Sequence, residues 1–255
     1  MNVRILEGIH TVLKYAHRTD MEPKPFLTSD RKIEKKELTG FVKPFASKGL
    51  IQLTVKYVDI KRDHDVHVYV PGLRRIARVS GGNRCDCLGG FIFNMDDQLY
   101  FSGIVPDFNY ELIEVKEALV PTLYPAYPEP HWPTINAHSS PVKLERREIW
   151  YIEQVPKDPT YCYGKRIFAY DPESRVYVGS RIYDNKGELW KYVGIYYSVK
   201  KNPADKGGGY VQGMDADDVV DFKIWEGGQM RGGQTRNLDL PTDLFTLDSM
   251  RRWGR

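Results

Sequence analysis

The chain is poor in cysteine, with only Cys85, Cys87 and Cys162 among its 255 residues. An odd number of cysteines at these spacings excludes a small scaffold stapled by several disulfides. Cys85 and Cys87 lie so close in sequence that a bond between them would be strained, so at most one ordinary disulfide can form. We therefore expect free thiols, which pack as small hydrophobic side chains.

Long hydrophobic runs are also missing. No stretch approaches the roughly 18 apolar residues that a membrane-spanning helix requires. Charge interrupts residues 1–8, where a secretory signal would carry its apolar segment, so we expect no signal peptide in this chain. Taken literally, this start favours a cytoplasmic protein, whereas the start of a mature fragment would say nothing about the compartment.

An excess of charge of one sign is the third absence. The chain has 37 Lys and Arg residues against 34 Asp and Glu residues, which gives a net charge of +3. Proteins that bind nucleic acid usually carry a dense basic patch. The balanced charge therefore predicts no nucleic-acid partner.

Motifs for catalysis or metal binding are absent as well. The chain has no Gly-x-Ser-x-Gly elbow and no paired Cys-x-x-Cys sites. His64 and His67 would point to opposite faces of a strand, and the adjacent Asp96 and Asp97 are typical of a turn. Gly207–Gly209 is not followed by the Lys-Ser/Thr of a phosphate-binding loop. We therefore expect no enzyme, no cofactor and no metal.

The composition that remains is typical of a β-rich globular protein. Aromatic residues make up 13% of the chain and include 17 Tyr, which favours strands. All-β domains often reach this length as one unit. We predict a single β-rich domain over residues 1–255, with an N-terminal segment of uncertain structure at 1–48 and a Pro-rich surface loop at 121–141.

The segment Asp65–Arg78 predicts a half-buried antiparallel hairpin. Val66, Val68 and Val70 alternate with polar or aromatic residues, so one face is apolar. Pro71-Gly72 is a turn signal, because Pro fixes φ and Gly tolerates positive φ. The return strand is basic and carries Arg74, Arg75 and Arg78.

Similar alternation predicts further strands joined by short turns. They cover residues 51–57, 109–119, 147–155, 163–170, 175–183, 189–199 and 219–225. Asp171-Pro172 fits the first two positions of a type I turn. Consecutive strands with short turns pair antiparallel, which predicts one sheet of about eight or nine strands.

Other segments give weaker signals. Ile9, Val12, Leu13 and Ala16 fit a helical stripe, although residues 10–17 also fit a strand. Residues 32–37 are a charge run, which predicts a solvated turn or short helix. Residues 227–233 are glycine-rich and predicted to be irregular, and residues 241–252 predict a short helix.

The strand over residues 189–199 is apolar on both faces. Val193, Ile195 and Tyr197 alternate with Trp190 and other aromatic residues. A sheet with two apolar faces must be covered twice, once by the core and once by helices, a partner or a lipid. Ordinary core packing is the plainer interpretation, and a contact with a partner or a lipid on the second face is the functional alternative.

Four segments together resemble a known family. They are residues 49–78, residues 107–112, residues 163–171 with 183–191, and residues 240–246. The chain resembles the outer-membrane lipoprotein-sorting-like proteins, in an uncharacterised branch (a domain of unknown function) related to LolA and LolB. The stretch Arg84–Gly90 departs from that family's pattern. Relatives usually carry a signal peptide and further upstream sequence, so we expect a C-terminal fragment, a miscalled start or a short member.

The resemblance implies a mainly β fold, a curved antiparallel sheet or open half-barrel, with helices or loops on its concave side. It implies a non-enzymatic periplasmic or outer-membrane-associated binding or carrier protein. The ligand would be hydrophobic, either a lipid or a lipid-modified (acylated) protein. The alternative is a structural or interaction protein that docks on a membrane exporter or envelope complex. A third and remote alternative is an enzyme that uses the loop of Cys85 and Cys87.

The residues expected to line the ligand site are apolar and come from three predicted strands. They are Val66, Val68, Ile182, Val193, Ile195 and Tyr197. Arg74 and Arg78 are the candidates for contact with an anionic head group, against the plainer alternative of charge on a solvated hairpin. The sequence does not decide which apolar face is the concave one.

Overall fold

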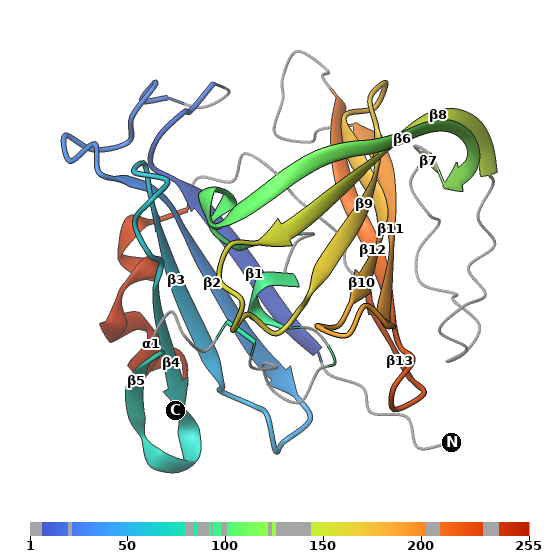
Figure 1. Ribbon diagram of the computed structural model, residues 1–255. Helices are drawn as coiled ribbons and strands as arrows, with labels where there is room; N and C mark the ends of the chain where they lie inside the picture. The colour runs from blue at the N-terminus through green and yellow to red at the C-terminus, as the bar shows by residue number, and fades with distance from the viewer. Residues whose placement is uncertain are drawn as a thin grey trace. The chain divides into compact units, whose positions relative to one another are not determined.

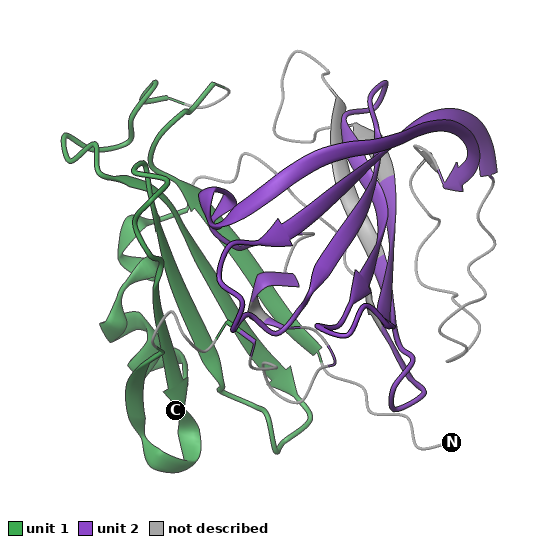
Figure 2. Ribbon diagram, viewed as in Figure 1, with its two compact units in different colours: residues 1–84, 237–255 green, residues 85–236 purple. Residues whose placement is uncertain are grey.

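The computed structural model describes residues 7–19, 22–79, 84–85, 92, 94–97, 101–121, 124–125, 144–201, 210–231 and 240–254. The chain divides into two compact units, residues 1–84 with 237–255, and residues 85–236 (Figure 2). The single domain expected from the sequence stays a prediction. Among the described residues, no helix is both long and apolar enough to cross a membrane.

The first unit contains a five-stranded antiparallel sheet whose strands follow one another in chain order (Figure 1). The strands are β1 (Glu7–Lys14), β2 (Ile33–Lys43), β3 (Ile51–Tyr57), β4 (Asp65–Val70) and β5 (Arg75–Val79). The predicted hairpin is present, with the short 3₁₀ turn η1 (Pro71–Leu73) between β4 and β5.

Two N-terminal predictions are settled by this sheet. The segment around Val12 is a strand and not a helix, because β1 pairs with β2 along its whole length. The charge run 32–37 was predicted to be a solvated turn or short helix, and this was wrong. It begins β2, where Glu37 is buried between two lysines instead of solvated. Pairing with these lysines makes the burial of Glu37 tolerable.

One face of the first sheet is covered by the C-terminal residues. The 3₁₀ helix η6 (Thr242–Phe245) and the helix α1 (Leu247–Trp253) place Phe245 and Met250 at its centre. They pack with Leu13, Tyr15, Ile51, Leu53 and Tyr69. Thr246 begins α1 with a capping box, because its hydroxyl accepts a hydrogen bond from the Ser249 amide. The short helix predicted at 241–252 is confirmed.

The second unit contains a larger antiparallel sheet in the order β13-β12-β11-β10-β9-β8-β6 (Figure 1). Its strands are β6 (Phe108–Pro121), β8 (Leu144–Pro156), β9 (Lys165–Asp171), β10 (Val176–Tyr183), β11 (Leu189–Lys201), β12 (Tyr210–Asp221) and β13 (Glu226–Arg231). A two-residue strand, β7 (Tyr124–Pro125), pairs with β11 in parallel. Among the described residues, the 3₁₀ turns η4 (Met95–Asp97) and η5 (Val105–Asp107) precede β6 in this unit.

The turns of this meander follow local side-chain chemistry. The buried Asp171 carboxylate accepts hydrogen bonds from the Glu173 amide at 3.0 Å and the Ser174 hydroxyl at 2.7 Å. This fits the type I turn predicted there, since Asp at the first position bonds the backbone two residues on. Asp184 does the same for the Lys186 amide at 2.9 Å.

Two predictions for the C-terminal part of this sheet need correction. The segment 219–225 was predicted to be a strand, but the strand β12 ends at Asp221 and a turn follows. Residues 227–233 were predicted to be irregular, yet β13 includes Gly227 to Arg231 and pairs with β12. A Cβ at Gly228 would lie 3.3 Å from the Val219 side chain, so glycine here permits close packing.

The mainly β, antiparallel fold with little helix is therefore confirmed. The predicted strands at 51–57, 109–119 and 147–155 correspond to β3, β6 and β8, and β9 to β11 match their predictions similarly. The Pro-rich loop predicted at 121–141 lies mostly outside the described residues, as does Gly207–Gly209.

Candidate ligand-binding face

One face of the second unit's sheet carries a buried hydrophobic cluster. Directly paired residues on adjacent strands share a face. Ile182 pairs with Lys191, and Val193 lies one alternation further along β11, so all three share that face. The cluster consists of Tyr163, Ile182, Val193, Ile195, Tyr197 and Val219. We call this side of the sheet the apolar face.

A continuous series of ring contacts extends across the same side. Neighbouring ring centroids are 4.7–6.2 Å apart, and most pairs meet at a steep angle. The series is Trp150, Tyr170, Tyr177, Phe168, Phe101, Phe108, Tyr161, Tyr163 and Trp190. Such tilted pairs contribute stability beyond the area they bury. Phe101 and Phe108 belong to the chain that precedes and begins β6, so that chain packs directly on the face.

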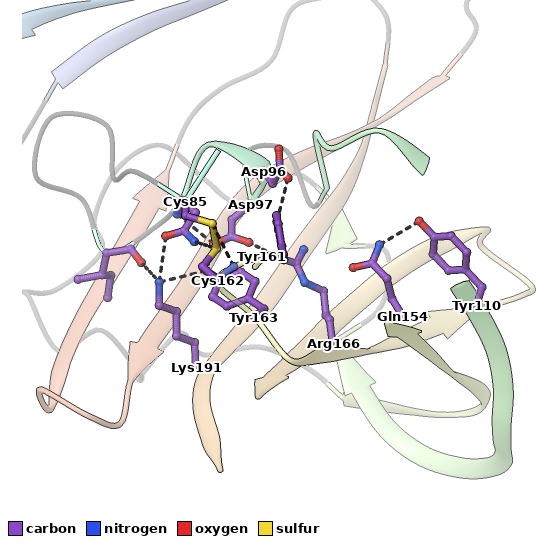
Figure 3. Close-up of polar contacts among 12 residues, drawn as sticks. Cys85, Asp96, Asp97, Tyr110, Gln154, Tyr161, Cys162, Tyr163, Arg166 and Lys191 are labelled. Atoms are coloured by element: carbon purple, nitrogen blue, oxygen red, sulfur yellow. Dashed lines mark hydrogen bonds and ion pairs between the residues drawn. A yellow bond between two sulfur atoms is a disulfide. The ribbon is translucent and has the colours of Figure 1, made fainter. Parts of the chain in front are cut away.

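The described residues between Ile92 and Phe108 form this cover, and we call them the crossing segment. At one end Ile92 packs against the hydrophobic cluster, and its carbonyl accepts a hydrogen bond from Lys191 Nζ at 2.8 Å. Further along, Asp97 forms an ion pair with Arg166 of β9 (Figure 3). Lys191 and Arg166 thus fix the crossing segment on the apolar face at two points.

The ion pair of Arg166 with Asp97 is fully buried, since each side chain is only 2% exposed. Asp97 Oδ2 also accepts hydrogen bonds from Tyr163 Oη at 2.7 Å and the Asn94 amide at 3.0 Å. Burial lowers the pKa of Arg166, but the Asp97 carboxylate outweighs this and raises it overall. Three rings of the aromatic series lie 5.4–5.5 Å from the guanidinium carbon. The Asp97 carboxylate therefore compensates the buried Arg166 charge in surroundings that are otherwise largely apolar.

The half-buried Tyr161 and the buried Tyr163 complete the polar contacts. Tyr161 Oη donates to Asp96 Oδ2 at 2.8 Å, and Tyr163 Oη accepts from Lys191 Nζ at 3.1 Å. Burial, and then the neighbouring carboxylates, raise the pKa of both phenols. Both hydroxyls therefore stay protonated at neutral pH and serve as hydrogen-bond donors to the crossing segment.

A disulfide links Cys85 to Cys162, with their Cα atoms 5.8 Å apart. The expectation of free thiols was wrong for these two residues, and Cys87 lies outside the described residues. The partners are 77 residues apart in sequence, so only the fold brings them together. Cys162 lies between Tyr161 and Tyr163, and its sulfur accepts from Asn94 Nδ2 at 3.2 Å. The disulfide is therefore continuous with the polar contacts of the crossing segment.

The apolar face continues beyond the crossing segment, over β6 and β8. Leu112 pairs with Ile152 and Val115 pairs with Trp150, which places these side chains on that face. Leu112 is 51% exposed and Val115 is 47% exposed, and Trp150 is also exposed. We call Leu112, Val115 and Trp150 the apolar strip. It offers hydrophobic surface beside a packed core, which often marks a binding site.

The boundary of the strip is polar. Gln154 is buried and pairs with Arg166 on the adjacent strand. Its Nε2 donates to Tyr110 Oη at 2.9 Å (Figure 3). Burial raises the pKa of Tyr110. An amphipathic ligand on the strip would therefore meet neutral hydrogen-bonding groups at this end.

Four of the six predicted lining residues come together. Ile182, Val193, Ile195 and Tyr197 are all in the hydrophobic cluster, where packed protein atoms surround them. Val66 and Val68 lie in the first unit, on β4, and are half-buried. A lining role for all six residues stays a prediction.

The two predicted head-group residues lie in the first unit. Arg74 is an exposed residue at the end of η1 with φ of 50°, so the return strand begins at Arg75. Arg78 forms an ion pair with Asp65, which also accepts a hydrogen bond from Tyr57. The Tyr57 hydrogen bond is the main reason that the pKa of Asp65 is lowered. Contact with a head group stays a prediction.

The first sheet has a different, polar face opposite α1. Glu37 is buried, with Lys35 Nζ at 2.8 Å and Lys56 Nζ at 3.6 Å from its Oε1. Burial raises the pKa of Glu37, but the lysines outweigh this and lower it overall. The Lys56 charge also acts on His64, because burial and then Lys56 lower the pKa of His64 to about 4.

Within the described residues, no three His, Cys, Asp or Glu side chains form a metal-binding group.

Sequence reasoning missed the residues that hold the crossing segment. Arg166 shares its face with Phe168, and Lys191 shares its face with Val193, so a cation interrupts an apolar face in each strand. That interruption was the available signal. Asp96 and Asp97 were expected in a turn, and they are in η4, but both carboxylates are buried.

The chain matches a known protein family over most of its length. A family model described as a protein of unknown function (DUF1329) matches residues 6–251. No curated protein matches the chain.

Solved structures with the same fold come from three bacteria. A structure described as an outer membrane lipoprotein-sorting protein domain from Vibrio parahaemolyticus is 17% identical with a TM-score of 0.63, and the match covers 88% of this chain and 80% of that one. A DUF1329 family protein from Desulfovibrio piger is 14% identical with a TM-score of 0.63, over 96% and 90%. A LolA superfamily protein from Nitrosomonas europaea is 16% identical with a TM-score of 0.51, over 84% and 77%. At these identities the likeness establishes the fold alone.

Proposed function

This chain belongs to the DUF1329 family, and on that premise we propose that it is a non-enzymatic carrier of a hydrophobic ligand. The ligand is a lipid or the acyl chains of a lipid-modified protein. The fold shared with a domain described as lipoprotein-sorting supports this proposal. The apolar strip is the observation that carries it, because it leaves hydrophobic side chains open to a ligand.

The proposed mechanism is reversible burial of acyl chains on the strip. Leu112, Val115 and Trp150 adjoin the aromatic series through Tyr170, so a bound chain would extend a surface that is already apolar. Each buried methylene contributes about 0.8 kcal/mol, so partial burial of one long chain gives useful affinity. The ligand is released when a stronger apolar acceptor competes for it.

The disulfide supports a compartment outside the cytoplasm. Bonds such as Cys85–Cys162 form and persist in oxidising surroundings, including the bacterial periplasm. We place the protein in the periplasm or at the outer membrane. This assignment agrees with the description of the Vibrio parahaemolyticus domain.

The test is lipid capture by the purified chain. Native mass spectrometry after incubation with phosphatidylethanolamine or a triacylated lipopeptide should detect about one bound lipid per chain. Leu112→Asp should reduce the bound fraction, because a carboxylate on the strip must be desolvated by the acyl chain. Ile60→Asp is the matched control, since Ile60 is an exposed apolar residue of the first unit.

Two results would contradict the carrier proposal. One is no lipid bound to the unmodified chain at any lipid concentration below aggregation. The other is equal loss of lipid in Leu112→Asp and Ile60→Asp. Either result would favour the second candidate function, an interaction protein that docks on an envelope membrane protein. The exposure of both faces of β6 is the observation that favours this candidate.

A further inference from the structure

The edge strand β6 presents an unusually open surface. It is 14 residues long, and every residue from Asn109 to Glu117 is exposed. Within the described residues, β8 is its only long pairing partner. An edge strand with free backbone N–H and C=O groups is a template for pairing with another strand. This inference does not depend on the carrier function.

The two faces of β6 have different chemistry. Val115 is on the apolar face, opposite Trp150. Glu114 and Lys116 are on the other face, opposite Tyr151 and Ile149. Their two side chains are exposed and form an ion pair along the strand at 2.8 Å. An added strand would therefore meet apolar and charged positions in alternation.

The charge order on β6 is complementary to itself in one symmetric register. In an antiparallel pair centred on Val115, Glu114 faces the partner's Lys116, and Lys116 faces the partner's Glu114. A register centred on Glu114, Lys116 or Glu117 would instead place a like charge opposite itself. Opposite charges directly across two strands are favourable, and like charges are unfavourable.

We propose that β6 pairs antiparallel with β6 of a second copy of this chain, centred on Val115. The contact is isologous, so each favourable charge pair occurs twice. The register of β6 against β8 shifts between Leu112 and Glu114, so regular contact centred on Val115 is confined to Glu114, Val115 and Lys116. The dimer is therefore weak and depends on concentration. It extends the apolar strip across the two-fold axis, since Val115 meets the partner's Val115.

Charge reversal tests this register directly. Sedimentation equilibrium should detect a monomer–dimer equilibrium for the unmodified chain. E114K and K116E should each weaken dimerisation about tenfold or more, because each places like charges opposite each other at two sites. The double variant E114K/K116E should restore dimerisation to within about threefold of the unmodified chain, since opposite charges face each other again. Both residues are exposed, so the variants should keep the fold, which circular dichroism checks.

Cross-linking supplies a second readout. In a Cys87→Ser background, Val115→Cys should form a covalent dimer on oxidation, because the residue meets its own copy. Leu119→Cys is the matched control, since Leu119 is at least as exposed but would face Glu111. A monomer at all accessible concentrations, failure of the double variant to dimerise, or equal cross-linking of both cysteines would overturn the proposal. Lipid capture by E114K/K116E distinguishes the dimer proposal from the carrier proposal, because Glu114 and Lys116 are not on the apolar face.

Discussion

The two ends of the apolar face differ in what covers them, not in the kind of side chain they carry. On β10 and β11, Ile182 and Ile195 are fully buried under the crossing segment. On β6, Leu112 is half exposed although it belongs to the same face. The comparison shows that alternation in the sequence defines which face of the sheet is apolar. The crossing segment, which Arg166 and Lys191 hold in place, decides how much of that face remains exposed.

The largest expected effect on stability comes from removing the Asp97 carboxylate, which holds the crossing segment on the apolar face. Asp97→Ala leaves the buried charge of Arg166 without its carboxylate, and it should cost about 3–5 kcal/mol of unfolding free energy. Urea denaturation measures this loss. Glu153→Ala is the control, because Glu153 bonds to the partly exposed Lys165 and its removal should cost less than about 1 kcal/mol. Equal costs for the two variants would mean that the cover does not depend on this ion pair.

Shortening one side chain at each end of the apolar face tests the difference between the covered and the exposed end. Ile195→Ala should destabilise the protein by about 2–5 kcal/mol, because it leaves a cavity in packed surroundings. Leu112→Ala should change stability by no more than about 0.5 kcal/mol, because the side chain already contacts solvent. The same denaturation experiment measures both. A large loss at Leu112 would show that the strip is covered in solution.

The Cys85–Cys162 disulfide should make a smaller contribution to the unfolding free energy. Cys162→Ser should lower the unfolding free energy by about 2–4 kcal/mol in oxidising buffer, because the unfolded chain is no longer cross-linked. Cys85→Ser should have the same effect, since it removes the same bond. Cys87→Ser is the matched control and should be neutral, because the disulfide does not include it. Under reducing conditions the differences among the three variants should disappear.

The smallest effect concerns the polar face of the first unit and its response to acid. The pKa of His64 is lowered from 6.5 to about 4, so the unfolded chain binds this proton more readily than the folded chain. Stability is therefore complete above about pH 6.5 and falls as the pH drops towards 4. His64→Gln should have a shallower decline over that window, measured by urea denaturation at several pH values. An unchanged slope would assign the acid response to other groups, such as His10, whose pKa is also lowered by burial.

Much of the fold could be predicted from local sequence. Alternation located β3, β4 and the meander from β8 to β11, and Asp171 with Pro172 marked a turn. The prediction failed where tertiary context overrides local character. Residues 32–37 look solvated, but most of them lie in β2, which pairs with β3 and buries Glu37. Gly228 of β13 looks irregular, but it allows close contact with Val219.

The candidate site was only partly predictable. The cluster of Ile182, Val193 and Ile195 followed from alternation, although their burial under a crossing segment did not. Arg166 and Lys191 were visible as cations on apolar faces, yet nothing local indicated their partners. The open part of the face on β6 was predicted as a strand but not as exposed surface.

The sequence by itself determined the strands, most turns and the alternation of apolar and polar faces, because these depend on residues within a few positions of each other. Only the tertiary structure decided which cysteines pair, which carboxylate meets Arg166 and which end of the apolar face stays open. These contacts join residues far apart in the chain, 77 positions for Cys85 and Cys162 and 69 for Asp97 and Arg166. Local propensity carries no information about such pairs, because their partners are selected by the packing of the whole sheet.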